Sequence, residues 1–147
     1  MILEKIMSKP VVTVELNDSL RTVKEIFDSS SFHHLLVEEH GELFGVISDR
    51  DLLRAISPHI GTLLETNRDA ATLNKRVHQI MTRKPVTLRR SADVFEAIAL
   101  FNRHRISCIP ITDTENRIEG IVSWRDIFRL LEANRQKTAV PINQSRT

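Results

Sequence analysis

Along the chain, short runs of consecutive apolar residues alternate with segments in which apolar residues are spaced three and four positions apart. Polar turn residues separate the two kinds of segment. The first pattern predicts buried strands and the second predicts amphipathic helices. In the first half of the chain they predict the order strand, helix, strand, strand, helix. We expect strands at 11–14, 35–37 and 43–47, a helix that Asn17-Asp18-Ser19 caps and Ser29-Ser30-Ser31 ends, and a helix from about Ser48 to Ser57-Pro58.

The second half predicts the same order of elements. Ser91 is the expected cap of a helix whose inward face carries Val94, Ala97, Ile98 and Phe101. Strands are expected at 109–111 and 118–122, and the last helix at about 124–133. Between the halves, 61–77 is polar but contains spaced apolar residues, and Thr62-x-x-Glu65 fits a capping box, so we expect a helical connector.

Two pairs of motifs indicate that the halves are copies of one unit. Met7-Ser8-Lys9-Pro10 recurs as Met81-Thr82-Arg83-Lys84-Pro85, and Gly45-Val46-Ile47-Ser48-Asp49-Arg50-Asp51 recurs as Gly120-Ile121-Val122-Ser123-Trp124-Arg125-Asp126. A repeat this long favours two small subdomains that share an interface. We therefore expect a first unit at 1–57, a connector at 58–79, a second unit at 80–135 and a disordered tail at 136–147.

Composition narrows the class of protein. With 147 residues and 41% hydrophobic content the chain can bury an ordinary core, but each half alone would be marginal. The sequence has no apolar run of signal-peptide or membrane-span length, so we expect a cytoplasmic protein without membrane contact. Cys108 is the only cysteine, which excludes an internal disulfide and any multi-cysteine metal site. We expect no metal, no catalytic constellation and no enzymatic activity.

Charge is distributed unevenly between the copies. Residues 1–74 carry 7 basic and 12 acidic side chains, whereas residues 75–147 carry 14 basic and 7 acidic ones. One interpretation is that both faces are simply solvated. The other is an antiparallel homodimer in which the acidic first unit of one chain faces the basic second unit of another, with Trp124 at the interface.

The repeated Ser-x-x-Asp at the end of each glycine-containing motif has two readings. Serine followed three positions later by an acidic residue is a capping box, and capping alone would explain the pair. However, in each copy a glycine precedes the serine within the strand, as expected where another backbone or a ligand approaches closely. A strand that leads into a helix start is also a common place for phosphorylated ligands to bind.

These motifs together resemble the cystathionine β-synthase (CBS) domain, here as a stand-alone tandem pair, the Bateman module, over about residues 1–135. The resemblance implies an α/β (α+β) fold in which two β-α-β-β-α units pack through their small sheets with pseudo-twofold symmetry. It also implies that an adenine nucleotide binds between the units. The implied ribose ligands are Ser48, Asp51, Ser123 and Asp126.

The resemblance assigns the other parts of a nucleotide less specifically. The implied adenine slots are lined by Val12 and Thr13, Val86 and Thr87, and the central-strand residues Ile109 and Pro110. The family often places a His-Arg pair for phosphate at the start of the central strand, where this chain has His33-His34 and then Ser107-Cys108. The remaining candidate phosphate ligands are Arg50, Arg103, Arg105 and Arg125.

We therefore expect a regulatory module that senses AMP, ADP, ATP or a related adenosyl ligand, reports the energy state through a dimer or partner surface, and carries no other cofactor. The alternative is a dimerisation or interaction scaffold in which the motifs only cap helices. Nucleic-acid binding through the basic second unit is disfavoured, because little aromatic interleaving and no groove-reading motif accompany the charge. The regulated protein partner is not identified by the sequence.

Overall fold

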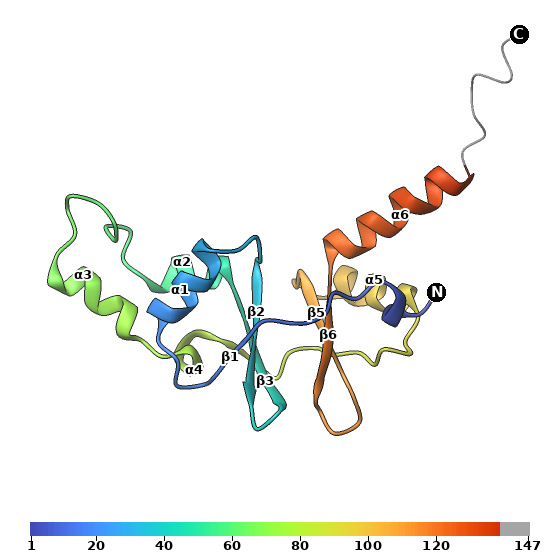
Figure 1. Ribbon diagram of the computed structural model, residues 1–147, viewed down its shortest axis with the longest axis horizontal. Helices are drawn as coiled ribbons and strands as arrows, with labels where there is room; N and C mark the ends of the chain where they lie inside the picture. The colour runs from blue at the N-terminus through green and yellow to red at the C-terminus, as the bar shows by residue number, and fades with distance from the viewer. Residues whose placement is uncertain (139–147) are drawn as a thin grey trace, which may run out of the picture.

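The computed structural model describes residues 1–138. Its two units lie side by side in Figure 1, each with a small sheet and helices on the side away from the other unit. The first unit contains β1 (Thr13–Val14), α1 (Leu20–Asp28), β2 (His34–Glu39), β3 (Glu42–Ser48) and α2 (Asp49–Ala55). The second contains α5 (Val94–Arg103), β5 (Cys108–Thr112), β6 (Ile118–Ser123) and α6 (Trp124–Thr138). The predicted order of elements in the first unit is confirmed.

Alternating side chains of the central strands explain how the sheets pack. In β2, Leu35 and Val37 lie in the core of the first unit, whereas Leu36 is fully buried but belongs to neither core cluster. In β5, Ile109 and Ile111 lie in the second core. Because successive residues of a strand face opposite sides of a sheet, Leu36 and Pro110 point towards the seam between the units. The sheets therefore pack against each other, as expected.

Contacts between the two hairpin turns close one end of the seam. The backbone N–H of Leu43 donates to Asn116 O at 3.0 Å, and Asn116 Nδ2 donates to Leu43 O at 2.9 Å. Glu42 forms an isolated β-bridge with Arg117. Towards the opposite end, His34 Nε2 and Ser107 Oγ share a hydrogen bond of 2.6 Å. Side-chain and backbone contacts thus hold the units together along the length of the strands.

The two units exchange their opening segments. Residues 3–7 include η1 (Leu3–Lys5), and Leu3, Ile6 and Met7 pack in the core of the second unit. Conversely, α4 (Val77–Ile80) and Met81 pack in the first core, and β4 (Thr82–Arg83) extends the first sheet beside β3. Figure 1 shows the N-terminal segment beginning beside α5 and crossing to β1. The expected bounds place residues 3–7 in the first unit and 77–79 in the connector, whereas residues 3–7 pack in the second core and α4 packs in the first.

This exchange accounts for the glycines of the repeated motif. A Cβ at Gly45 would lie 2.7 Å from Met81 Sδ and 2.7 Å from the carbonyl oxygen of Thr82. A Cβ at Gly120 would likewise lie 2.7 Å from Met7 Sδ. Of the two explanations offered by the sequence, close approach of another chain segment is therefore the one observed. In each unit, the glycine therefore contacts the methionine from the opening motif of the other copy.

Two predicted helix caps are wrong. α5 begins after Asp93, whose carboxylate accepts from Phe95 N, and Glu96 completes the capping box, so Ser91 lies before the cap. In the connector, α3 (Asn67–Ala71) begins after Thr66 with Asp69 as its capping partner. The expected box of Thr62 and Glu65 is instead part of the preceding turn, where Thr62 Oγ1 donates to His59 O. At each helix start, a Thr-x-x-Asp or Asp-x-x-Glu pair a few residues later forms the capping box instead.

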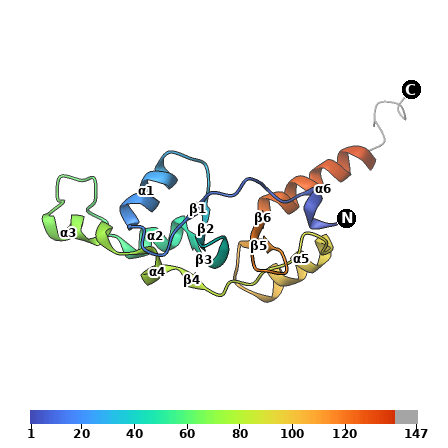
Figure 2. The same cartoon turned by 60° about the horizontal axis from the view of Figure 1, so that its bottom comes forward.

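The ends of the connector and of the last helix differ from their expected positions. Within the connector, α3, η2 (Thr72–Asn74) and the first residues of α4 are helical, and turns precede α3. α6 continues to Thr138, five residues past its expected end, and extends away from the body of the second unit in Figure 2. The tail expected at 136–147 thus begins inside this helix, and its remainder lies outside the described residues. None of the helices in residues 1–138 combines the length and apolar character that crossing a bilayer requires.

Candidate functional site

Both Ser-x-x-Asp motifs lie where the last strand of a unit leads into a helix. At the first junction, Ser48 N donates to Asp51 Oδ2 at 2.8 Å, and Asp51 N donates to Ser48 Oγ at 3.0 Å. At the second, Ser123 N donates to Asp126 Oδ2 at 2.8 Å and Ser123 Oγ donates to the same oxygen at 3.2 Å. One carboxylate oxygen of each aspartate is therefore committed to its own serine.

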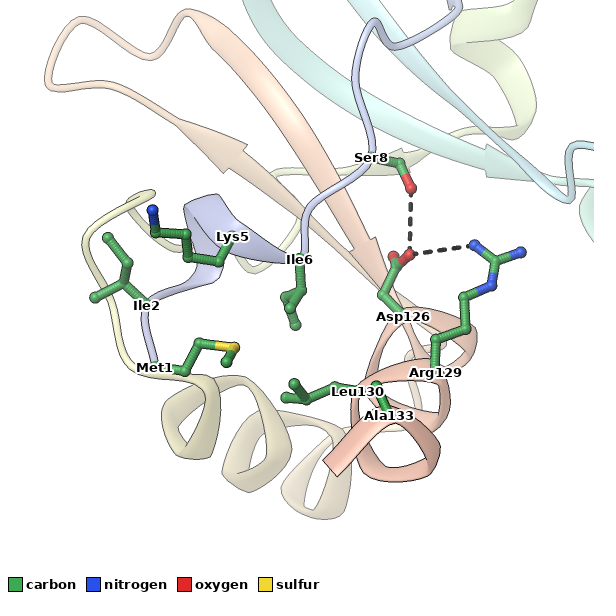
Figure 3. A pocket seen from close by; sticks show the side chains of 9 residues that line it. All are labelled: Met1, Ile2, Lys5, Ile6, Ser8, Asp126, Arg129, Leu130 and Ala133. Carbon is green, nitrogen blue, oxygen red and sulfur yellow. Dashed lines mark hydrogen bonds and ion pairs between the residues drawn. The ribbon is translucent and has the colours of Figure 1, made fainter. Parts of the chain in front are cut away.

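The second junction receives a side chain from the exchanged segment. Ser8 Oγ donates to Asp126 Oδ1 at 3.2 Å, and Ser8 also pairs with Ile121 of β6. Arg129, one turn further along α6, has Nη1 3.9 Å from the same oxygen, and Asp126 is only 7% exposed (Figure 3). Sequence reasoning missed Ser8 and Arg129, although Ser8 is in the repeated Met-Ser motif and Asp-x-x-Arg occurs in both copies.

The first junction is more open. Asp51 is half-buried, and within residues 1–138 neither Thr82 nor Arg54, the counterparts of Ser8 and Arg129, bonds to its carboxylate. Asp51 does lie close enough to Cys108 of the second unit to raise the pKa of that thiol, although burial is the larger cause. The pKa of Cys108 reaches about 12, so the thiolate needed for nucleophilic chemistry does not form near neutral pH.

A cavity of ≈ 670 Å³ lies beside the second junction. Met1, Ile2 and Ile6 form one side and Leu130 and Ala133 of α6 the other, while Ser8 and Asp126 lie at the end nearest the first unit (Figure 3). Lys5 and Arg129 are the cations among its lining residues. Its volume is in the range of small-molecule pockets, and its walls are largely apolar.

The predicted phosphate ligands fall into two groups. His33 and His34 flank the first junction: His33 Nδ1 is 2.9 Å from Asp49 Oδ2, and His34 is the direct cross-strand partner of Ser48. Burial alone would raise the pKa of Asp49, but the hydrogen bonds from His33 and from the Arg50 backbone, together with the charges of the two histidines, hold that pKa below its usual range. The arginine candidates are exposed, and in the described part of the chain no hydrogen bond or ion pair orients the side chains of Arg50, Arg103, Arg105 and Arg125.

The predicted adenine slots are only partly assembled. Val12 packs at the edge of the first core and Thr13 pairs with Leu36, close to the seam. Thr87 lines a separate cavity of ≈ 430 Å³ that contains none of the four motif residues. Ile109 is fully buried in the second core, so its side chain cannot line a slot, whereas Pro110 is buried on the opposite face of β5. The exposed ring of Trp124 packs edge-on against Phe101 at 6.4 Å.

Comparison with known proteins identifies the repeated unit. The CBS domain profile matches residues 3–58 and 77–133. A CBS domain-containing protein of Dictyostelium discoideum is 32% identical over 132 residues, covering 88% of this chain and 90% of its own length. An L-aspartate semialdehyde sulfurtransferase of Methanocaldococcus jannaschii is 29% identical over 88% of this chain, but the chain spans only 23% of that enzyme.

A solved structure shares the arrangement of both units. The CBS domain pair of protein MJ0100, in complex with 5′-methylthioadenosine and S-adenosyl-L-methionine, is 28% identical and superimposes with a TM-score of 0.75. The similarity covers 91% of this chain and 98% of that one. The match to the sequence profile and the superposition over both repeated units lead to the same identification. The chain belongs to the CBS domain family, as a tandem pair of CBS domains.

Proposed function

We propose that this CBS pair is a regulatory module that binds an adenine nucleotide or a related adenosyl ligand at the two junctions and reports it through a dimer or partner surface. The observation that carries the proposal is the contact between Ser8 and Asp126, because a ligand at this carboxylate lies where the exchanged N-terminal segment meets the start of α6. The adenosyl ligands of the MJ0100 pair support the choice of ligand class.

The chemistry of each junction suits a ribose. A carboxylate with one oxygen bound to its capping serine retains acceptor positions for the two vicinal ribose hydroxyls. Ser48 and Ser123 add a hydroxyl beside Asp51 and Asp126. Adenine would then lie against apolar seam residues near Val12 and Pro110, with backbone groups reading its edge.

Calorimetric titration tests the proposal directly. AMP, ADP, ATP and S-adenosylmethionine are titrated into ligand-stripped protein and into the variants Asp51→Ala and Asp126→Ala, with the exposed Asp28→Ala as a matched control. We expect at least one ligand to bind, each site variant to lose one site, and the control to bind as the unmodified chain does. If none of the four ligands binds, the nucleotide-sensor function is refuted.

A scaffold without ligand is the second candidate. It is favoured by the first junction, where Ser48 and Asp51 form a complete capping box and so already satisfy the helix start. This reading predicts that saturating nucleotide leaves the melting temperature unchanged. An increase in melting temperature that Asp51→Ala or Asp126→Ala abolishes would favour the sensor instead.

We infer a homodimer as the signalling surface. Trp124, Phe128 and Leu131 form an exposed apolar stripe on α6, and they are 50%, 64% and 56% exposed. Leu53 of α2, the counterpart of Phe128, is 71% exposed. An antiparallel arrangement would set the acidic half of one chain, with 12 acidic and 7 basic residues, against the basic half of the other.

Two separate measurements test the dimer: its mass in solution, and the orientation of the two chains within it. We expect twice the chain mass by light scattering and a monomer for Phe128→Asp, with the solvent-exposed Glu132→Ala as control. Cross-links between the first unit of one copy and the second unit of another are expected. Cross-links only between equivalent units would refute the antiparallel arrangement.

A further inference from the structure

Two histidines distinguish the first junction from the second. His34 is the cross-strand partner of Ser48 in the ladder between β2 and β3, so its ring lies beside a hydroxyl that the proposed function assigns to the ribose. His33 is adjacent and is paired with Asp49 at 2.9 Å. A nucleotide held by Ser48 and Asp51 would therefore have imidazole rings within reach of its 5′ substituent.

The surroundings of His34 favour its uncharged form in the ligand-free protein. Burial lowers its pKa, and this effect exceeds the opposing influence of Asp49 and Asp51, while His33 lowers the pKa further. From the second unit, Ser107 shares a hydrogen bond with Nε2. Cys108 is the remaining titratable neighbour, and it stays a neutral thiol because its pKa is raised to about 12. Asp49, His33 and Asp51 are thus the titratable groups that influence the ring.

The second junction lacks this chemistry. In the ladder between β5 and β6 the cross-strand partner of Ser123 is Cys108, and Ser107 precedes it. Trp124 occupies the position that corresponds to Asp49. The cations near Asp126 are Arg129 at 3.9 Å and, in the adjoining cavity, Lys5 and the Met1 ammonium, which is paired with Asp93. Arginine and lysine keep their charge across the neutral range, so anion binding here does not require a proton.

We propose that the first junction binds anionic adenosyl ligands together with one proton, which His34 takes up from solvent, and that the second junction binds them without one. This inference rests on the proposed function. An anionic 5′ group placed beside the neutral ring favours the imidazolium form, because an opposite charge nearby stabilises the protonated state. The first site would then select phosphorylated over unphosphorylated nucleosides more strongly as pH falls.

Adenosine 5′-sulfate is a suitable probe, because its charge is constant where a phosphate would itself titrate. It is titrated into Asp126→Ala, which retains the first site, and into Asp51→Ala, which retains the second, in two buffers of different ionisation enthalpy at about pH 7. Buffer-dependent heat reports proton uptake. We expect up to one proton per ligand at the first site, none at the second, and none at either site with adenosine.

His34→Gln in the Asp126→Ala chain is expected to abolish the proton uptake that accompanies binding of the sulfate. Nuclear magnetic resonance of the unmodified chain gives an independent measurement, since the titration midpoint of the His34 ring must rise when the sulfate binds. Sulfate binding at the first site without proton uptake, or uptake that persists in His34→Gln, overturns this inference alone. Absence of binding by every adenosyl ligand overturns the proposed function as well.

Discussion

Met81 lies against Gly45 so closely that a side chain could be added there only if neighbouring atoms shifted: a Cβ would be 2.7 Å from Met81 Sδ and 2.7 Å from the carbonyl oxygen of Thr82. The same contact joins Met7 to Gly120, but the nearest backbone atom is Ser8 O at 3.1 Å. A methionine side chain can shift, whereas a backbone oxygen in a sheet cannot move without disturbing its hydrogen bonds.

Alanine substitutions at the two glycines should therefore have unequal effects. We expect Gly45→Ala to lower the free energy of unfolding by about 2–3 kcal/mol and Gly120→Ala by about 1 kcal/mol, as overpacking typically does. Urea denaturation of the pair measures the difference. Equal effects, or a larger effect at Gly120, would contradict the role of the Thr82 carbonyl.

Leu3 and Val77 occupy matching positions in the exchanged segments, and both are fully buried. Leu3→Ala should cost about 2–5 kcal/mol and should loosen the second unit, although Leu3 lies in the first half of the sequence. Val77→Ala should loosen the first. Hydrogen exchange resolved by peptide checks where protection is lost, and the half-exposed Ile2→Ala serves as the control. Loss of protection confined to residues 13–55 in Leu3→Ala would contradict the exchange.

Ser8 and Thr82 provide a second matched pair. Removing the Ser8 hydroxyl takes a donor from a buried carboxylate, so Ser8→Ala should destabilise the chain by about 1–2 kcal/mol. Thr82 is exposed and makes no such bond, so Thr82→Ala should change stability by less than about 0.5 kcal/mol. Thermal unfolding of both variants tests this difference. Similar costs would show that the Ser8 contact contributes little.

Stability without ligand should decrease in mild acid. Because folding lowers the pKa of His34, the unfolded chain binds its proton more readily, and the stabilisation from the neutral ring is complete above the ordinary pKa of 6.5. It is lost as pH falls through the pKa of the folded state. The free energy of unfolding should therefore drop between about pH 7.5 and about pH 5.5.

Substitution of His34 isolates this contribution. His34→Gln should show a smaller drop over the same interval, whereas the exposed His59→Gln should behave as the unmodified chain does. The pKa of Asp49 is also lowered by folding, but its ordinary value is 3.8, so its contribution is lost in a more acidic range. An identical pH dependence in His34→Gln and the unmodified chain would contradict the assignment to His34.

Local patterns were sufficient to predict most elements and to identify the family. Capping residues and apolar periodicity correctly predicted α1 and α2, and the expected caps Ser19 and Ser48 are the ones observed. Ser91 failed as a cap because Asp93 and Glu96 form a better pair two residues later. A single sequence cannot distinguish such competitors, since each satisfies the same spacing rule.

The site was less predictable because it depends on contacts between distant segments. Ser48, Asp51, Ser123 and Asp126 follow from a repeated motif, and the structure brings each pair together. Ser8 reaches Asp126 only through the exchange, which no local pattern encodes. The side chain of Ile109 lies in the second core because side chains alternate along β5, and the face that a residue takes depends on the register of its strand.

The exchange of opening segments also bears on how the tandem pair could have arisen. A single unit would leave its own core open and present an opening segment suited to another copy, so two separate copies would associate reciprocally. Joining two such copies through a connector converts an association between molecules into one within a molecule, at a much higher effective concentration. Duplication of such a unit would therefore require no new interface, because each methionine would meet the other copy's glycine as it does here.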